Sequence, residues 1–260
     1  MSAIRVPVLM YHRIGSAHNK WEKKLCVSQK YFESHMHALS EVGYSACSME
    51  NFIRWLNKDI ELPDKTLLIT FDDGFLGVHD YALPVLRELG WPATVFLVTS
   101  LIGEQDIWCR DENPSGKTYP LVGLREIEKL KASGFSIFSH SRNHADLGVL
   151  DDDDLENELL GSRHDLENIL DEPVEYFAYP YGRYNERVIV KLKEAGYKAA
   201  FSVQPGFNRQ NIDPYRIRRI DVFGTDTSSN LLRKISYGVN DGSWRQVIRY
   251  YFNRLLAKRA

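Results

Sequence analysis

The feature that most constrains the fold is a unit that occurs three times: an amphipathic helical segment, a glycine, an aromatic residue and then an apolar strand. The glycine–aromatic pairs are Gly90–Trp91, Gly134–Phe135 and Gly196–Tyr197. Helices that end at a glycine and lead directly into a buried strand are typical of crossovers between parallel strands. Further short apolar segments bring the expected strands to seven or eight. We therefore predict an α/β fold, a distorted (β/α) barrel of about seven parallel strands, similar to a TIM barrel.

The composition is that of a globular protein without a strong charge bias. Of the 260 residues, 43% are hydrophobic and 26% are charged, and the formal net charge is −2. This balance gives the chain no general attraction for nucleic acid. Three widely spaced cysteines without a CxxC pair indicate neither a disulfide framework nor a cysteine zinc site. Because no apolar leader or bilayer-spanning run is found, we expect a cytoplasmic protein, unless a signal peptide has been removed.

Charged residues follow the apolar strand predicted over Leu67–Phe71. Asp72 and Asp73 come directly after it, and alone they would indicate no more than a turn. After another strand-like run, however, come His140 and His144, two imidazoles four residues apart. Two histidines and one carboxylate form a three-ligand metal site with open coordination positions. That arrangement is expected of a hydrolytic rather than a structural zinc.

A third histidine, His12, follows the short apolar segment at the beginning of the chain. In barrels of parallel strands, functional residues collect at the C-terminal ends of the strands. We therefore expect His12, Asp72, Asp73, His140 and His144 to share one rim of the barrel.

Three other segments fit the repeated unit less well. Residues 103–123 form a long irregular insertion, which either shapes substrate access or is a tolerated surface loop. The acidic run Asp151–Asp154 lacks the spacing and the glycine of an EF-hand loop, so we interpret it as the beginning of a helix. Residues 243–260 are expected to form a basic amphipathic helix beside a main domain over 1–242. That helix either covers part of the domain or makes a peripheral contact with an anionic membrane.

Three ordered motifs make a resemblance specific. They are Thr70-Phe71-Asp72-Asp73-Gly74, His140-Ser141-Arg142-Asn143-His144 and Tyr179-Pro180-Tyr181-Gly182. Together they resemble the polysaccharide deacetylase family, carbohydrate esterase family 4, with its NodB-like homology domain. The resemblance covers about residues 7–222, and the opening Pro-Val-Leu-Met-Tyr-His-Arg is most similar to the bacterial poly-N-acetylglucosamine deacetylase branch. It implies a metal-dependent hydrolase that removes N-acetyl groups from an N-acetylated sugar or polysaccharide.

The resemblance also implies a role for each matching residue. It assigns Asp73, His140 and His144 to one divalent metal ion, for which zinc is expected first and cobalt, nickel or iron as alternatives. Asp72 takes the role of general base, because a neighbouring carboxylate can accept the proton of a water whose pKa the metal lowers towards ~7. The backbone N–H of Tyr181 corresponds to the group that stabilises the oxyanion.

The chain departs from the family pattern at the arginine that tethers the catalytic aspartate, because Ala178 occupies that position. Arg216, Arg218 and Arg219 lie on a late strand and are candidates to replace it. The resemblance favours Arg219 as the tether of Asp72, although strand alternation could equally place its side chain in solvent.

A second departure concerns the general acid, since no histidine follows His164. The leaving amine still requires a proton donor. In the branch that the chain resembles, the matching position is His12, which we expect to be the acid. The alternative is a strand-end histidine that is hydrogen-bonded in the core.

Two other functions compete with deacetylation. The first is a catalytically weak or inactive carbohydrate-binding protein on the same fold, which Ala178 favours and an intact Asp72 opposes. The second is phosphoryl transfer with Asp72 as nucleophile, but it leaves the histidine pair without a role and the chain has no phosphate-binding glycine loop.

Overall fold

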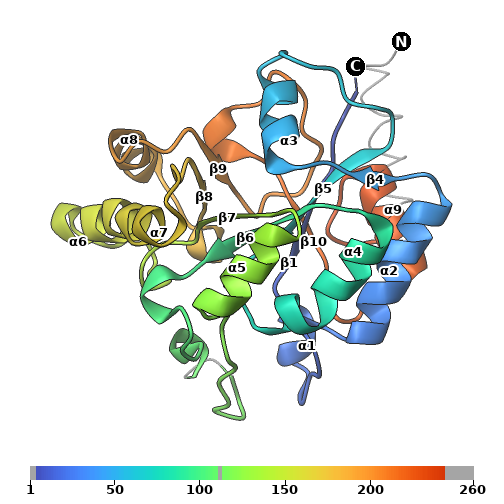
Figure 1. Ribbon diagram of the computed structural model, residues 1–260, viewed down its shortest axis with the longest axis horizontal. Helices are drawn as coiled ribbons and strands as arrows, with labels where there is room; N and C mark the ends of the chain where they lie inside the picture. The colour runs from blue at the N-terminus through green and yellow to red at the C-terminus, as the bar shows by residue number, and fades with distance from the viewer. Residues whose placement is uncertain (1–3, 111–112, 244–260) are drawn as a thin grey trace, which may run out of the picture.

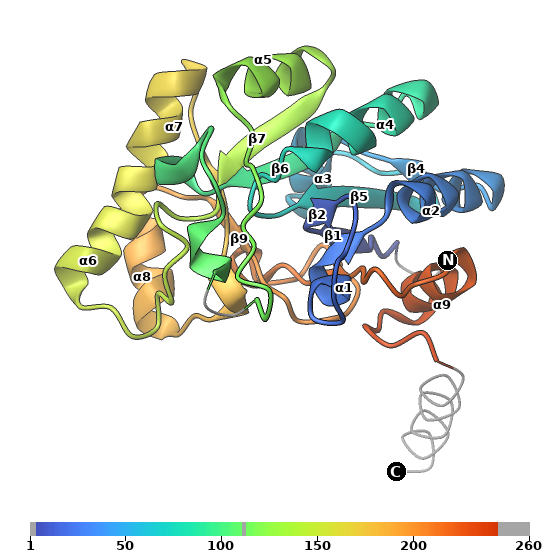
Figure 2. The same ribbon diagram turned by 90° about the horizontal axis from the view of Figure 1, so that it is seen from below.

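The computed structural model describes residues 4–110 and 113–243. The expected helix over residues 243–260 therefore lies outside the described residues, except for Ser243. The described residues form one curved parallel sheet with helices packed outside it (Figures 1 and 2).

Seven strands follow one another across the sheet, all parallel, in the order β10-β1-β5-β6-β7-β8-β9. A short strand, β4, pairs with β5 beside this path, and β2 and β3 form a separate parallel pair. The strands are β1 (Val8–Tyr11), β2 (Arg13–Ile14), β3 (Cys26–Val27), β4 (Ser45–Ala46), β5 (Thr66–Phe71), β6 (Ala93–Leu97), β7 (Phe135–Ser139), β8 (Tyr176–Ala178), β9 (Ala199–Phe201) and β10 (Ile220–Asp221). The prediction of a distorted (β/α) barrel with about seven parallel strands is confirmed.

Helical segments connect the strands. The α-helices are α1 (Glu22–Leu25), α2 (Gln29–Glu41), α3 (Met49–Leu56), α4 (Leu83–Leu89), α5 (Leu124–Ala132), α6 (Asp152–Glu156), α7 (Ser162–Leu170), α8 (Glu186–Glu194) and α9 (Ser228–Tyr237). The 3-10 and π-helical turns are η1 (Val78–Ala82), η2 (Thr99–Leu101), η3 (Ile107–Cys109), η4 (Asn157–Gly161), η5 (Pro180–Gly182) and η6 (Pro214–Arg216). In Figure 2, α7, α5, α4 and α2 form an arc outside the strands, as right-handed crossovers require.

The capping signals of the sequence produce the expected helix boundaries. Ser28 accepts a hydrogen bond from the backbone N–H of Tyr31 and begins α2. The acidic run begins α6, since Asp151 accepts a hydrogen bond from the N–H of Asp154. One difference is that the helical pattern after this run is interrupted by the π-helical turn η4 before it continues as α7.

Strands β1, β5 and β6 are buried on both faces, which explains why they are nearly continuous apolar runs in the sequence. Along β5, Leu67 and Ile69 pack into the larger cluster with the outer helices, whereas Leu68 packs into a second cluster. That second cluster contains Phe96 of β6 and Phe201 of β9, so side chains fill the concave side of the sheet. The functional polar side chains are therefore expected at the ends of the strands. No helix among the described residues is long and apolar enough to cross a bilayer.

Candidate active site

The register of the sheet brings the expected residues to one edge. Tyr11 of β1 is paired with Phe71 of β5, so His12 and Asp72 follow neighbouring strands at the same level. The N–H of Asp72 continues the ladder by donating to the carbonyl of Tyr11 (2.9 Å). On the next strands, the N–H of His140 continues the pairing of β7 with β6. The prediction that these residues share one rim therefore agrees with the pairing of the strands.

Asp73, His140 and His144 converge at this rim. Their candidate ligand atoms all lie within 4.8 Å of one another, and all three residues are buried. The Nε2 atoms of His140 and His144 lie 3.4 and 3.2 Å from Oδ1 of Asp73. No other group of three histidine, cysteine or acidic side chains in the described residues has this geometry.

The donor set fits a divalent cation. Oδ1 of Asp73 is buried and has no well-aligned hydrogen-bond partner among the described residues, so a cation would satisfy it. Nδ1 of His140 lies 2.8 Å from the carbonyl oxygen of Ala178, which can only accept. Nδ1 therefore carries the proton, and the lone pair of Nε2 faces Asp73. This is the usual arrangement of a metal-binding histidine.

The turns that carry these side chains contain backbone conformations that residues other than glycine rarely adopt. Of the seven non-glycine residues with positive φ in the described part of the chain, four belong to the candidate site: Asp73 (72°), Ser141 (68°), His144 (59°) and Tyr181 (56°). Such strain persists only where surrounding contacts fix the backbone. Strained residues that cluster at one rim of the sheet indicate a functional site there.

The turn between the two histidines is held by a buried carboxylate of η4. Glu158 accepts hydrogen bonds from the backbone N–H groups of Arg142 (3.0 Å) and Asn143 (2.9 Å). The N–H of His144 donates to Oγ of Ser141 (3.0 Å). The π-helical turn η4 thus places the Glu158 carboxylate against the turn between His140 and His144. This role of Glu158 was not predicted from the sequence.

Asp72 is held by a buried arginine from the other end of the chain. The guanidinium of Arg219 donates to Oδ1 and Oδ2 of Asp72 at 2.6 and 2.7 Å, and both side chains are almost fully buried. A further hydrogen bond to the carbonyl of Ser202 (3.0 Å) fixes the arginine. Arg219 therefore lies in the core and not in solvent. Of the other two candidates, Arg216 pairs with Glu186 and Asp213 at the surface.

Arg218, the third candidate, donates to the carbonyl of Pro205. Among the three arginines, only Arg219 donates two hydrogen bonds to the carboxylate of Asp72.

The charges at the rim keep both aspartates ionised. Burial alone would raise the pKa of Asp72, but the positive charge of Arg219, with smaller contributions from His140 and His12, lowers this pKa below its ordinary value. Burial would likewise raise the pKa of Asp73, and the adjacent imidazoles lower it well below the usual range. Asp72 is therefore a carboxylate at neutral pH and can accept a proton.

His12 is half-buried at the end of β1 and lies in the electrostatic field of the site, since its charge acts on Asp72 and Asp73. It also acts on Asp221, whose pKa burial raises and His12 lowers in part. Asn240 fixes Asp221 by pairing with its backbone N–H (2.9 Å) and its carboxylate (2.8 Å). Asp221 was not predicted from the sequence to lie near the site, although it stands two residues after Arg219 at the end of a strand.

The turn η5 is fixed by packing at Gly182. This glycine has φ +66°, and a Cβ added there would lie 2.2 Å from a methyl group of Val203. Only glycine fits this position without movement of the backbone. The neighbouring Tyr181 is 38% exposed, and its ring meets the His144 ring edge-on, with centroids 4.5 Å apart.

The irregular insertion 103–123 reaches the site through Trp108. The indole stacks on the His144 ring, with centroids 4.6 Å apart and planes 19° apart. The same insertion carries Asp106, whose pKa burial raises to about 6, with a further rise from the charge of Asp73. Of the two interpretations of this segment, a wall of the site agrees better with these contacts than a tolerated surface loop.

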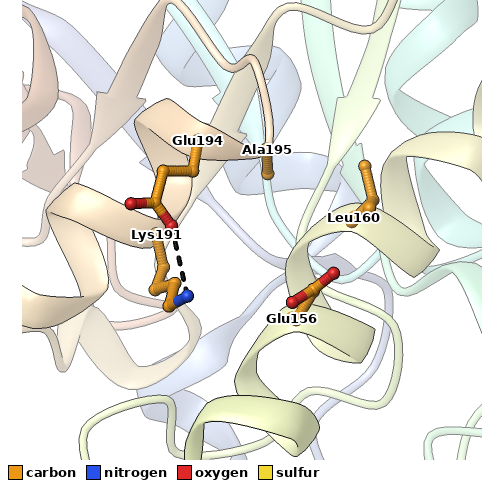
Figure 3. Close-up of a pocket in the computed structure, with 5 residues that line it drawn as sticks. All are labelled: Glu156, Leu160, Lys191, Glu194 and Ala195. Atoms are coloured by element: carbon orange, nitrogen blue, oxygen red, sulfur yellow. Dashed lines mark ion pairs between the residues drawn. The ribbon is translucent and has the colours of Figure 1, made fainter.

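The outer helices carry a pocket of a different kind. It has a volume of about 110 Å³, lies between α8 and the segment α6–η4, and is lined by Glu156, Leu160, Lys191, Glu194 and Ala195 (Figure 3). Lys191 and Glu194 are neutralised by a mutual ion pair of 3.2 Å. None of the strand-end residues lines it, so we exclude it as the catalytic site.

Comparison with known families agrees with the geometry. The family model for polysaccharide deacetylase matches residues 59–200, which is more than half of the chain. The chain belongs to the polysaccharide deacetylase family. Its matched region contains Asp72, Asp73, His140, His144 and the turn at Tyr181, whereas His12 and Arg219 lie outside it.

Relatives of this deacetylase family cover most of the chain. The protein YxkH of Bacillus subtilis, a presumed polysaccharide deacetylase, is 28% identical over 84% of this chain and 71% of its own length. The poly-beta-1,6-N-acetyl-D-glucosamine N-deacetylase of Staphylococcus aureus is 24% identical over 87% of this chain and 81% of its own. The polysaccharide deacetylase BC0361 of Bacillus cereus has a solved structure with a TM-score of 0.74 and 28% identity, covering 90% of this chain and 69% of that one.

Proposed function

We propose that this protein is a metal-dependent hydrolase that removes N-acetyl groups from an N-acetylated sugar or polysaccharide. The observation that carries the proposal is the buried Asp73, His140 and His144 cluster directly beside an aspartate held ionised by Arg219. A metal site can activate water for attack on an amide, and a separate charged carboxylate beside it can accept the proton of that water.

The metal ligands would be Nε2 of His140, Nε2 of His144 and the carboxylate of Asp73. Nitrogen and oxygen donors of this kind suit zinc first, and cobalt, nickel or iron as alternatives. When bound, the cation would polarise the acetamide carbonyl and lower the pKa of a water molecule.

The protein side chains supply the proton transfers. Asp72 accepts the proton of the attacking water, because its pKa is low and the two hydrogen bonds from Arg219 fix its orientation. His12, on the neighbouring strand end, donates a proton to the leaving amine. The backbone N–H of Tyr181 stabilises the oxyanion, and the tight packing of Gly182 supports this role by fixing the turn.

The substrate class follows from the relatives and the site. The Staphylococcus aureus relative acts, by its name, on a poly-N-acetylglucosamine. We extend the coarser class, an N-acetylated carbohydrate, to this chain.

A carbohydrate-binding protein without turnover is the weaker alternative. Its support was the absence of the family arginine at Ala178, but Arg219, directly before β10, supplies a guanidinium to Asp72 instead. Burying an ion pair costs several kcal/mol of desolvation per ion. A protein that only binds sugar would have no use for a buried Asp72–Arg219 pair.

The test is release of acetate from N-acetylated glucosamine oligomers, with and without chelator, for the wild type and Asp72→Asn. We expect Asp72→Asn to abolish turnover and to retain nearly all of its metal, because Asp72 is the base and not a principal ligand. Asp73→Ala should lose both. Asp153→Asn, an exposed aspartate of α6, is the matched control and should behave as the wild type. Loss of metal in Asp72→Asn would show that the roles of the two aspartates are exchanged, and chelator-resistant turnover would contradict metal dependence.

A further inference from the structure

The two histidines of the candidate metal site are oriented in different ways. The His140 ring is fixed by the hydrogen bond from Nδ1 to the carbonyl of Ala178 (2.8 Å). Nδ1 of His144 is equally buried, but it has no hydrogen-bond partner among the residues that the structure describes. Metal-binding histidines almost always donate this second N–H, which sets the ring orientation. Among the described residues, no hydrogen-bond acceptor at Nδ1 therefore sets the orientation of the His144 ring.

Two aromatic side chains contact the His144 ring instead. The indole of Trp108 stacks on one face of the His144 ring, with centroids 4.6 Å apart and an interplanar angle of 19°. The Tyr181 ring meets it edge-on, at 4.5 Å and 71°. Stacked and edge-to-face contacts at these distances are favourable and directional. Together they define the plane of the imidazole.

Trp108 can orient another ring only if it is itself held, and its loop is tied down on both sides. Asp106, just before η3, accepts a hydrogen bond from the N–H of Tyr119, and its own N–H donates to the Tyr119 carbonyl (3.0 Å). Just after the turn, the N–H of Asn113 donates to the carbonyl of Cys109 (2.8 Å).

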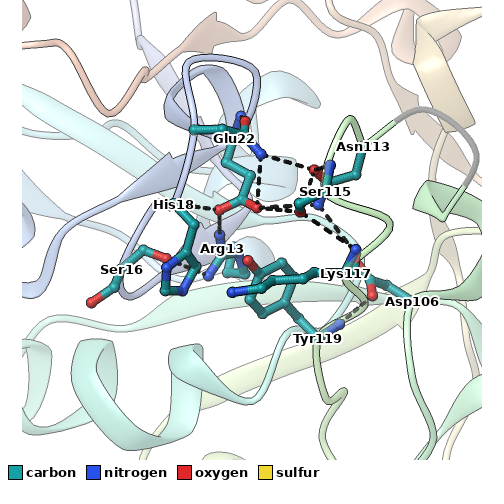
Figure 4. A network of polar contacts seen from close by, with 10 residues as sticks. Arg13, Ser16, His18, Glu22, Asp106, Asn113, Ser115, Lys117 and Tyr119 are labelled. Atoms are coloured by element: carbon teal, nitrogen blue, oxygen red, sulfur yellow. Dashed lines mark hydrogen bonds and ion pairs between the residues drawn. The ribbon is translucent and has the colours of Figure 1, made fainter.

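These tethers lead to one buried carboxylate from a different part of the chain, Glu22 (Figure 4). Glu22 accepts hydrogen bonds from Arg13 (3.1 Å), from the N–H of His18 (2.7 Å) and from the side chain of Asn113 (3.1 Å). The guanidinium of Arg13 also lies over the Tyr119 ring, 3.5 Å from its centroid. The network thereby joins the segment after His12 to the loop that carries Trp108.

We propose that Trp108 is a positioning residue for His144, its indole fixing by stacking the ring that no hydrogen bond fixes. The Glu22 network in turn positions Trp108. This proposal rests on the proposed function, since it takes His144 to be a metal ligand. It assigns a role in metal affinity to a side chain that is not one of the three candidate ligands.

The experiment measures the affinity of the metal-free full-length protein for Zn²⁺, by competition with a chromophoric chelator. In Trp108→Ala the His144 ring loses its stacking partner, and we expect Zn²⁺ to bind roughly ten- to hundredfold more weakly, the usual effect of removing a group that orients a ligand. Trp108→Phe keeps a ring in this place and should restore most of the affinity. Ile107→Ala, an exposed neighbour in the same turn (50%), is the matched control and should bind as the wild type does.

Two further readouts separate positioning from other roles. With Co²⁺ in place of Zn²⁺, the visible absorption of Trp108→Ala should shift, because the ligand geometry relaxes, and that of Ile107→Ala should not. Glu22→Gln should weaken Zn²⁺ in the same direction as Trp108→Ala. The proposal is overturned if Trp108→Ala binds Zn²⁺ as tightly as the wild type and differs only in KM, since the indole would then act on the substrate.

Failure of the proposed function would appear differently. If Asp73→Ala binds Zn²⁺ as well as the wild type, the metal site itself is wrong. If the wild type binds Zn²⁺ at the site but releases no acetate, the inference on Trp108 stands without the deacetylase.

Discussion

Removing the guanidinium of Arg219 is the sharpest test of how Asp72 is kept ready for catalysis. Arg219→Met retains most of the side-chain volume but leaves the Asp72 carboxylate buried, 2% exposed, without its two hydrogen bonds of 2.6 and 2.7 Å. Removing one partner of a buried ion pair typically costs about 3–5 kcal/mol of unfolding free energy. For a chain of this size that corresponds to a fall in Tm of roughly 6–20 °C.

The loss should depend on pH in a defined direction. In the wild type the pKa of Asp72 is lowered, so its stabilising contribution is complete above the unfolded-state pKa and disappears as the pH falls through the folded-state pKa. In Arg219→Met, burial remains without the compensating charge, so the pKa rises above the unfolded-state value. Ionisation then opposes folding, and the stability gap to the wild type widens from acid to neutral pH.

The assay is urea unfolding of both proteins from about pH 4, near the ordinary pKa of an aspartate, to about pH 8, together with acetate release over the same range. The activity of Arg219→Met should fall off at a higher pH than that of the wild type, because a base with a raised pKa is protonated sooner. Arg218→Met, at a neighbouring arginine that bonds to the carbonyl of Pro205, is the control. The double variant Asp72→Asn/Arg219→Met should recover part of the lost stability, since no charge is then left buried. A gap below ~1 kcal/mol at pH 7, the size of a surface pair, or a gap independent of pH would refute the reasoning.

Two further predictions concern the acid and the oxyanion turn. His12→Ala should lose most of kcat and change the Zn²⁺ affinity little, and a large loss of metal in this variant would make His12 a ligand and not the acid. Gly182→Ala should lose most of its activity, because a Cβ 2.2 Å from Val203 at φ +66° displaces the backbone that presents the Tyr181 N–H. Tyr181→Phe keeps that backbone and the ring and should remain active; equal losses in the two variants, measured by acetate release, would assign the role to the Tyr181 hydroxyl.

The strand-end residues could be predicted from the sequence because a parallel sheet leaves little freedom in where strands end. Once Leu67–Phe71 and the run before His140 are taken as parallel strands of one sheet, their C-terminal ends must lie at the same edge. Arg219 is different, because it lies directly before β10 and that strand contains only two residues, so there is almost no alternation from which an inward side chain could be inferred. Resemblance, and not periodicity, distinguished it from Arg218.

The contacts that support the ligands could not be predicted in this way. Trp108 lies in the three-residue turn η3, and Glu22 begins the four-residue helix α1. Their contacts reach distant parts of the chain, since Trp108 stacks on His144 and Glu22 bonds to Asn113. No helical or strand periodicity relates such residues. Glu158 was hidden for another reason, since its direction depends on the π-helical turn η4, which shifts the helix register locally.

The pairing of β10 with β1 determines when the catalytic centre can form. During synthesis the chain acquires Asp72, Asp73, His140 and His144 early, but the arginine that balances the charge of Asp72 emerges only with the last strand of the sheet. A chain that ends with the family-matched region at residue 200 would contain the proposed metal ligands and the proposed base, but not the arginine that pairs with that base. The charge balance of the proposed base therefore depends on the pairing of β10 with β1, two strands from distant parts of the described chain.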